Sequence, residues 1–368
     1  MIDRIPVHSG GDRLYDIVLT DSFAGLQKEL ETLSVSQRKL CIVTDSRVAP
    51  LYLAQVEEIL AKCCRMVGRF VFPAGEENKN LDTVRALYEY LIINKYDRRD
   101  CLVALGGGVV GDLTGFAAAT YLRGVDFIQL PTTLLSQVDS GIGGKTGVDF
   151  GSYKNMVGAF HMPKLVYTNV STLKTLPAKQ FSAGMGEVLK HGLIRDREYF
   201  SWLVENREPV LKGDPKALRL LIQGSDLIKR EVVELDPTEQ NERATLNFGH
   251  TLGHAIEKLK NFSMLHGHCV AVGALAAMEI SRRRGMITET DVENYRGALA
   301  GYGLPASVPD LSADEVLAAT KSDKKMEAGV IKFILLNGIG NACIDRTVTM
   351  EEMREGLLTV MDRDRKAV

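Results

Sequence analysis

The stretch that most constrains the fold is residues 101–150, where a short apolar run leads into three consecutive glycines and a helical pattern. Residues 101–105 are rich in Val and Leu and have the length of a buried strand, and residues 109–122 have helical periodicity. The glycines 106–108 between them let a ligand approach the backbone closely, because they have no Cβ. A helix that begins there directs unsatisfied N–H groups at the ligand. The stretch therefore predicts a cradle for a phosphate or pyrophosphate.

Two familiar nucleotide motifs match this stretch only in part. The string at 106–111 satisfies GxGxxG, but it lies a hundred residues into the chain, and the acidic residue about twenty positions on, Asp126, begins a strand instead of ending one. A plain strand–helix turn is an equal alternative. GGKT at 143–146 has the end of a P-loop, but Asp139 stands at the required first glycine. Walker-type ATP binding is not expected.

Length and composition set wide bounds. A chain of 368 residues with 45% hydrophobic and 25% charged residues is typical of globular protein and long enough for two domains. The net charge of -2 gives no reason to expect nucleic acid or acidic membrane as a partner. No apolar run approaches about 20 residues, and the N-terminal stretch lacks the apolar core of a signal peptide. The six cysteines have no CxxC spacing, so we expect reduced thiols and a cytoplasmic location.

The first part of the chain alternates strands with helices, which predicts an α/β fold with a doubly wound, mostly parallel sheet. Ligands of such sheets bind beyond the carboxyl ends of the strands, where this chain has Asp45, residues 73–76 and the glycine turn. Asp45 suits either a ribose hydroxyl or a helix N-cap. The predicted strands are 40–44, 66–72, 101–105 and 165–169, and the helices between them are 51–62, 81–93 and 109–122.

Beyond residues 169–177 the pattern is almost wholly helical, so we predict an α/β domain over 1–172 and a mainly helical domain over 173–368. One short strand is expected at 331–336. The predicted helices are 183–194, 198–211, 215–235, 243–259, 266–284, 290–300, 313–321 and 350–361.

Four of the seven histidines lie within nineteen residues. His250 and His254 are four apart in a helical pattern and so share a face, and His266 and His268 follow. Two histidines at this spacing with a third shortly after indicate a metal site.

Several longer blocks are individually specific. The chain reads GGGVVGD, ATYLRG, PTTLLSQVDSGIGGKTGVD and SYKNMVG, and later AGMGEVLKHG, LNFGHTLGHAIE, MLHG and SDKK. In these blocks and their order it resembles the 3-dehydroquinate synthase family over nearly its whole length.

The resemblance implies an NAD-dependent, metal-dependent lyase that acts as a cytoplasmic homodimer. It implies Zn²⁺ or Co²⁺ on Glu187, His250 and His266, with His254 as a general acid and base. The chain departs from the family at His268, where glutamate is usual, and at His191, where tyrosine is common. We expect His268 to lie at the pocket edge without a role.

The implied cofactor residues belong to the α/β half. Glu76 and Lys79 match a Gly-Glu motif with lysine three residues on, which contacts the adenosine half of NAD. The full set is Asp45, Glu76, Lys79, Gly107, Gly108, Val109, Asp112, Thr132, Thr133, Lys154, Thr172 and Thr175.

The implied substrate, 3-deoxy-D-arabino-heptulosonate 7-phosphate, carries a phosphate and a carboxylate and so requires fixed cations. Lys145 is expected in a glycine-rich loop. Glu239 keeps the register of a proton-accepting carboxylate, although DPTEQNER at 236–243 departs from the family's usual DEREGGLR. The other implied substrate residues are Arg123, Asp139, Asn155, Lys190, Lys229, Arg243, Asn247 and Lys324 or Lys325.

The implied reaction oxidises a substrate alcohol with NAD⁺, eliminates phosphate, returns the hydride and closes the ring by an aldol step to give 3-dehydroquinate. Three alternatives stay open: another sugar-phosphate cyclase such as a 2-deoxy-inosose or valiolone synthase, a metal-dependent polyol dehydrogenase, and a protein that binds NAD without turnover. The retained GGKTGVD block, Lys154 with Asn155, and Arg243 with Asn247 favour 3-dehydroquinate synthase over these alternatives.

Overall fold

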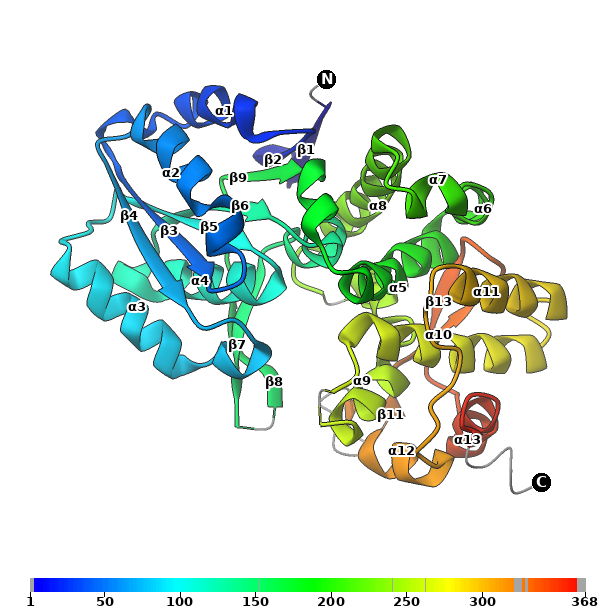
Figure 1. Cartoon of the computed structure of the whole chain (residues 1–368). Coiled ribbons are helices and arrows are strands. Elements are labelled where there is room, and N and C mark those ends of the chain that lie inside the picture. Colours follow the sequence, from blue (N-terminus) through cyan, green and yellow to red (C-terminus); the bar gives the residue numbers. More distant parts are fainter. Residues whose placement is uncertain are drawn as a thin grey trace. The chain divides into compact units, whose positions relative to one another are not determined.

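The computed structural model describes residues 3–151, 153–239, 241–261, 263–320, 326–327 and 330–362. It divides the chain into two compact units, Met1–Leu176 and Pro177–Val368 (Figure 1). Lys324 and Lys325, the alternatives for a substrate contact, lie outside the described residues.

The first unit is built on a seven-stranded sheet. Six neighbouring strands are parallel, and only β1 at one edge runs antiparallel to its neighbour. This confirms the predicted fold class. The strands in spatial order are β1 (Asp3–Ser9), β2 (Asp12–Thr20), β9 (Leu165–Asn169), β6 (Asp126–Pro131), β5 (Cys101–Gly106), β3 (Lys39–Asp45) and β4 (Met66–Phe72).

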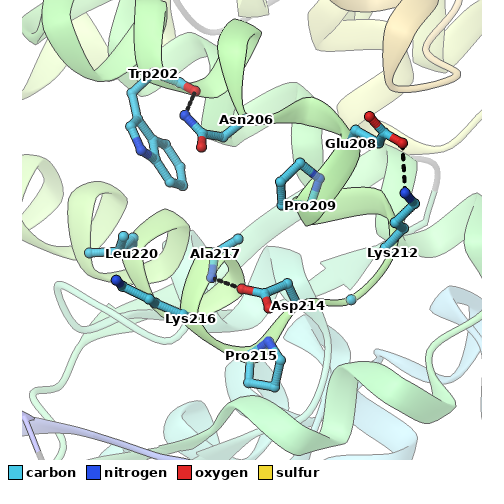
Figure 2. Close-up of a pocket in the computed structure, with 11 residues that line it drawn as sticks. Trp202, Asn206, Glu208, Pro209, Lys212, Asp214, Pro215, Lys216, Ala217 and Leu220 are labelled. Carbon is cyan, nitrogen blue, oxygen red and sulfur yellow. Dashed lines mark hydrogen bonds and ion pairs between the residues drawn. The ribbon is translucent and has the colours of Figure 1, made fainter.

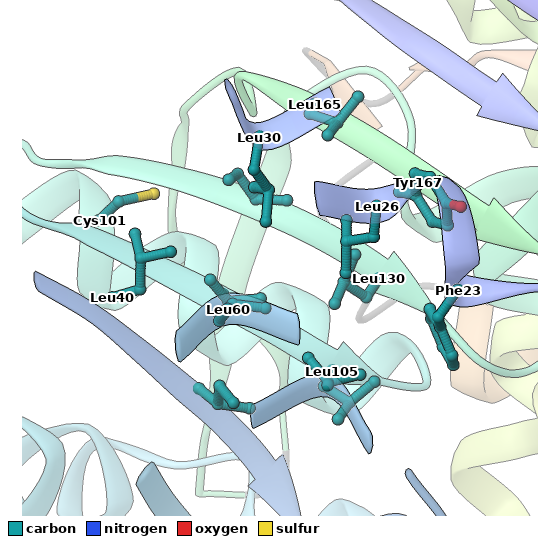
Figure 3. Close-up of a cluster of buried hydrophobic side chains, with 14 of the residues drawn as sticks. Phe23, Leu26, Leu30, Leu40, Leu60, Cys101, Leu105, Leu130, Leu165 and Tyr167 are labelled. Carbon is teal, nitrogen blue, oxygen red and sulfur yellow. The ribbon is translucent and has the colours of Figure 1, made fainter. Parts of the chain in front are cut away.

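Helices cover both faces of this sheet, because successive strand residues point to opposite sides. Leu40 and Ile42 of β3 belong to a core shared with α1 (Leu26–Thr32) and α2 (Ala54–Ala61), part of which Figure 3 shows. Their neighbours Cys41 and Val43 belong to the core on the other face, with α3 (Leu81–Ile93) and α4 (Gly108–Thr120).

The structure corrects two helices of this unit. The helix predicted at 51–62 starts at Ala54, after a wider π-helical turn over Ala49–Leu53. The helix predicted at 109–122 ends at Thr120, and Leu122 has a left-handed φ of 50° that no continuous helix contains.

A two-stranded antiparallel hairpin, β7 (Lys145–Phe150) with β8 (Tyr153–Phe160), follows β6 and was not predicted. The side chain of Thr146 in β7 packs against α4, where it fills the space that a Cβ at Gly115 would need. Lys145 therefore begins a strand and does not lie in the expected glycine-rich loop.

The second unit is mainly helical, as predicted. Its helices are α5 (Ala178–Arg195), α6 (Arg197–Glu205), α7 (Arg207–Leu211), α8 (Pro215–Leu235), α9 (His250–Leu259), α10 (His266–Arg283), α11 (Glu289–Gly301), α12 (Ala313–Thr320) and α13 (Met350–Leu358). Two small antiparallel hairpins accompany them: β10 (Met326–Glu327) with β11 (Val330–Ile331), and β12 (Phe333–Leu336) with β13 (Ala342–Asp345).

Two predicted helices of this unit are broken. The segment 198–211 forms α6 and α7, which meet at Asn206. The segment 243–259 forms a 3₁₀ helix, Glu242–Asn247, and then α9, because Gly249 has a φ of 78° and interrupts the helix. No helix among the described residues is long and apolar enough to cross a membrane.

Candidate active site

The second unit brings three histidines and a carboxylate together. Oε1 of Glu187 on α5 lies 3.5 Å from Nε2 of His250 on α9 and 3.5 Å from Nε2 of His266 on α10. A nitrogen of His254 lies within 4.8 Å of nitrogens of both other histidines. The structure thus gathers the predicted ligands and the predicted acid–base residue in one cluster.

Both ligand histidines are held through their second ring nitrogen. Nδ1 of His250 lies 3.1 Å from the carbonyl oxygen of Phe248, and Nδ1 of His266 lies 3.2 Å from a carboxylate oxygen of Glu257. A hydrogen bond at Nδ1 leaves Nε2 as the nitrogen that can bind a metal, which is how metal-binding histidines are usually oriented. The donors therefore fit a divalent cation such as Zn²⁺.

Negative charge concentrates at this cluster. Burial lowers the pKa of His266, but hydrogen bonds to Glu187 and Glu257 outweigh burial and raise that pKa to about 10. Glu187 is fully buried and also forms an ion pair with Lys190. The buried carboxylates of Glu187 and Glu257 together favour the binding of a cation between the imidazoles.

Glu257 was not among the predicted site residues, although the sequence contained a signal for it. It follows His250 by seven positions and His254 by three, so all three lie on one face of α9. An acidic residue at this spacing is suited to orient a ligand histidine.

The segment between α8 and α9 brings together three predicted substrate residues. The amide of Asn247 donates to Oε1 of Glu239 at 2.8 Å. Arg243 is buried, and its guanidinium donates to the carbonyl of Pro237 at 2.7 Å. The carboxylate of Asp236 accepts from the backbone N–H of Arg243 at 3.1 Å and fixes this bend. The altered DPTEQNER sequence therefore still forms an ordered turn over its described residues.

Lys229 is also buried, on α8, close to the carboxyl group of Asp226 one turn away. Burial raises the pKa of Asp226 well above its usual value, against the smaller opposing effect of Lys229. Burial thus favours the neutral form of Asp226 beside the buried Lys229.

The two histidines at which the chain departs from the family are both buried. Nε2 of His268 lies 3.2 Å from the hydroxyl of Ser182, which donates to the carbonyl of Gly303 at 2.9 Å. His268 thus ties α10 to α5 and to the end of α11, and the expectation that it has no role in the site stays a prediction. His191 is one turn beyond Glu187 on α5.

In the first unit, the predicted cofactor residues line the carboxyl edge of the parallel strands. Asp45 ends β3, and its Oδ1 accepts from the N–H groups of Arg47 and Val48 at 2.8 and 2.9 Å. Asp45 therefore fixes the turn after β3, but it is not a helix N-cap, because Val48 holds that position without a side-chain hydrogen bond. Thr132 follows the end of β6, and its N–H donates to the carbonyl of Gly106 at 2.9 Å.

The glycine turn is closely packed on this edge. A Cβ at Gly107 would lie 3.0 Å from Cγ2 of Thr133, and a Cβ at Gly108 would lie 2.9 Å from Oγ of Ser140. Val109 and Asp112 follow in the first turns of α4. A side chain would not fit at either position, so the backbone of this turn can face a ligand directly.

Thr172 and Thr175 lie in the 3₁₀ segment after β9. The hydroxyl of Thr172 donates to the carbonyl of Asn169 at 2.9 Å, and that of Thr175 donates to the carbonyl of Thr172 at 3.0 Å. Both threonines therefore cap the backbone that follows the strand.

A buried ion pair connects distant parts of the unit. Nζ of Lys79 lies 2.6 Å from Oδ2 of Asp112 on α4 and 2.6 Å from Oδ1 of Asn155 on β8. Burial lowers the pKa of Lys79, but the carboxylates of Asp112 and Glu76 outweigh it and raise that pKa. Predicted cofactor and substrate residues thus share one hydrogen-bond network.

Three further residues extend this network. Nζ of Lys154 lies 3.4 Å from Oε1 of Glu76. Oδ1 of Asp149 accepts from the N–H of Asn155 at 2.8 Å, and burial raises the pKa of Asp149. Asp139, in a π-helical turn over Ser136–Ser140, acts on the pKa of Asp112. Asp149 is a member that sequence reasoning missed, because the β7–β8 hairpin was not foreseen.

Arg123 is not brought to this edge. It lies beyond the C-terminal end of α4, whose N-terminal end is at the glycine turn. A helix of thirteen residues is about 20 Å long, so the arginine is well removed from the cradle at the opposite end of the helix. The substrate role implied for Arg123 stays a prediction, because its distance from the cofactor cradle does not test it.

A surface cavity of about 830 Å³ lies among the helices α6, α7 and α8 (Figure 2). Trp202 and Leu220 line it together with Lys212, which pairs with Glu208 at 2.6 Å. None of the predicted site residues lines this cavity.

Comparisons with known proteins agree with the site. Residues 69–183 match the family model for the 3-dehydroquinate synthase N-terminal region, and residues 184–326 match the model for the C-terminal region. A 3-dehydroquinate synthase of Acetivibrio thermocellus is 44% identical over 324 residues, covering 88% of this chain and 90% of that protein. One of Nitrosospira multiformis is 44% identical over 353 residues, covering 96% and 93%.

Solved structures give the same picture. A 2-epi-5-epi-valiolone synthase from Streptomyces hygroscopicus, solved with NAD⁺ and Zn²⁺, is 28% identical with a TM-score of 0.87 and covers 97% of this chain and 99% of its own. A 2-deoxy-scyllo-inosose synthase, solved with carbaglucose-6-phosphate, NAD⁺ and Co²⁺, is 27% identical with a TM-score of 0.85, covering 96% and 100%. A butanol dehydrogenase of Thermotoga maritima shares only the fold, at 14% identity and a TM-score of 0.72, covering 98% and 100%. With both family models matched and relatives at 44% identity, the chain belongs to the 3-dehydroquinate synthase family.

Proposed function

We propose that this chain converts 3-deoxy-D-arabino-heptulosonate 7-phosphate into 3-dehydroquinate and phosphate, with NAD⁺ and a divalent metal. The observation that carries the proposal is the meeting of Glu187, His250 and His266 with His254 at their side, in a member of this family. Two histidines, a carboxylate and a nearby proton-transfer group suit the oxidation of a substrate alcohol.

The second unit would hold the metal and the substrate. Glu187, His250 and His266 would hold Zn²⁺ or Co²⁺, which accept the same ligands. When bound, the ion supplies Lewis acidity toward substrate oxygens. His254 would move a proton at its ring nitrogen, beside the ligand nitrogens.

Buried cations in the same unit would bind the anionic groups of the substrate. Lys190, Lys229 and Arg243 are each buried, so water competes little with an anion for their charges. Glu239, held by the Asn247 amide, would accept a proton. Lys324 or Lys325 would add a further cation.

The first unit would hold NAD, which supplies a hydride acceptor and returns the hydride later. The glycine turn at the start of α4 offers backbone N–H groups to the pyrophosphate. The Glu76–Lys79–Asp112 network would position the adenosine half, and Asp45 would accept from a ribose hydroxyl in addition to its contacts in the turn after β3.

Lys145, Asp139 and Asn155 would contribute to the substrate site. We also propose a cytoplasmic homodimer. All six cysteines are thiols in the structure, which is consistent with a reducing compartment.

The test is phosphate release from the heptulosonate 7-phosphate with catalytic NAD⁺ and Zn²⁺, followed together with the absorbance of NADH. Stoichiometric phosphate without NADH accumulation is expected, because the hydride returns to the product. Accumulation of NADH with simple polyols would instead identify a dehydrogenase. Turnover of glucose 6-phosphate in place of the heptulosonate would identify another sugar-phosphate cyclase.

A further inference from the structure

Two of the helices that carry the metal-ligand candidates touch backbone to backbone. A Cβ at Gly186 on α5 would lie 2.2 Å from the carbonyl oxygen of Gly267 on α10, and a Cβ at Gly267 would lie 1.8 Å from the carbonyl oxygen of Ala183. Cβ atoms essentially never approach other atoms closer than 3.0 Å. Only glycine at both positions allows α5 and α10 to pack at their present separation.

The crossing of α9 with α10 has the same construction. A Cβ at Gly273 would lie 2.1 Å from the carbonyl oxygen of Gly249, and a Cβ at Gly253 would lie 2.9 Å from the carbonyl oxygen of Cys269. Helix α10 is therefore in close backbone contact with both of its partners in the metal cluster.

Three of these glycines are next to residues of the metal cluster in the sequence. Gly186 precedes Glu187, Gly267 follows His266, and Gly253 precedes His254. We propose that Gly186, Gly267, Gly253 and Gly273 are positioning residues that set the helix separations at which the metal ligands converge. The inference rests on the proposed metal dependence and adds the device that positions the ligands.

The separation of the helices matters because a metal site requires its ligands to be placed accurately. Metal ligands must be held within about 0.5 Å of the productive geometry, and Zn–N bonds are about 2.0–2.1 Å long. A methyl group at Gly267 or Gly186 would force α5 and α10 apart by more than that tolerance, because the obstacle is backbone on both sides. Glu187 would then move away from the two imidazoles.

The experiment compares Gly267→Ala, Gly186→Ala and Gly253→Ala in the full chain, with Zn²⁺ affinity measured by competition with a chromophoric chelator. Unfolding temperature in chelator reports stability separately. Gly356→Ala is the matched control, since a Cβ there would lie 2.7 Å from the carbonyl oxygen of Ala276, where α13 crosses α10 away from the ligands. Gly297→Ala on α11 is the second control, since nothing lies within 4 Å of its Cβ position.

We expect Zn²⁺ affinity to fall at least about tenfold in Gly186→Ala and Gly267→Ala, the range typical of lost support around a metal site, and less in Gly253→Ala. Gly356→Ala should lower the unfolding temperature but leave the affinity unchanged, and Gly297→Ala should change neither. Wild-type affinity in folded Gly186→Ala and Gly267→Ala, or an equal loss in Gly356→Ala, would overturn the inference.

Should Gly267→Ala and Gly186→Ala not fold by circular dichroism, the milder Gly253→Ala decides the matter. A measurable affinity loss in that variant, absent from Gly356→Ala, supports the inference, and no loss refutes it. Failure of the unmodified protein to bind Zn²⁺ would instead refute the proposed metal dependence, so the two failures are distinguishable.

Discussion

Nδ1 of His266 lies 3.2 Å from a carboxylate oxygen of Glu257, so a residue outside the ligand set orients a ligand. We expect Glu257→Gln to lower Zn²⁺ affinity by about 10- to 100-fold, because the amide holds the imidazole less strongly. Chelator competition measures this. Glu293→Gln, at an exposed pair with Arg296 on α11, is the control and should leave affinity unchanged. Equal affinities in the two variants would show that Glu257 does not support the ligand.

His254 and His250 are neighbours on α9, yet the proposal gives them different roles. His254→Asn should lower the rate of phosphate release by about 10²- to 10⁴-fold, the usual contribution of a general acid or base, while the bound zinc stays stoichiometric. His250→Asn should lose the metal. Elemental analysis together with phosphate release separates the two. Loss of zinc from His254→Asn would make that residue a ligand.

The buried pair of Lys79 and Asp112 makes a prediction about stability. Lys79→Met would leave the largely buried carboxylate of Asp112 without its partner and should lower the free energy of unfolding by about 3–5 kcal/mol. Urea denaturation at pH 7 measures the change. Lys62→Met, which removes an exposed pair with Glu58, should have little effect. A Lys79→Met protein as stable as the unmodified chain would contradict the importance of this pair.

The hydrogen bond from Arg284, at the end of α10, to Glu352 leads us to expect a stability that depends on pH. Its hydrogen bond lowers the pKa of Glu352 on α13 from its ordinary value of 4.5 to about 2. A carboxylate with a lowered pKa in the folded state stabilises the fold above its unfolded pKa, and this stability is lost as the pH falls toward the folded pKa. Glu352→Gln should therefore be less stable than the unmodified chain at pH 7.

The difference should shrink as the pH falls from about 4.5 to 2, because the unmodified chain loses the same interaction there. Thermal melts of both proteins across this range test it. A difference that stays constant with pH would show that the glutamine acts through packing and not through charge.

The sequence predicted the regular parts of this fold well, for physical reasons. Strands β4 and β9 and helices α3 and α8 have the predicted bounds, because the apolar pattern of each is continuous and its ends carry turn residues or caps such as Asn80 and Asp214. The β7–β8 hairpin was missed, because glycines at 147 and 158 interrupt its apolar pattern and let its strands lie close.

The candidate site could be predicted only where residues are close in sequence or belong to specific family blocks. The histidine cluster was visible because His250 and His254 fall on neighbouring turns of α9 and His266 begins the next helix, α10. The contact of Lys79 with Asp112 and Asn155 spans 33 and 76 residues, and no local pattern indicates it. The contact of His268 with Ser182 was likewise not foreseen, because the two residues are 86 positions apart.

Helix α10 has one further consequence for the second unit. Fifteen of its eighteen residues are buried, most of them Ala, Gly and Val, and it begins at a metal ligand and ends beside Arg284, which holds α13. A rod about 27 Å long with so little spare volume on any side can neither bend locally nor slide without loss of packing. A clash at its middle would thus displace the neighbouring helix α13 and not α10 itself, so the metal ligand at the start of α10 keeps its position when the last helix is disturbed.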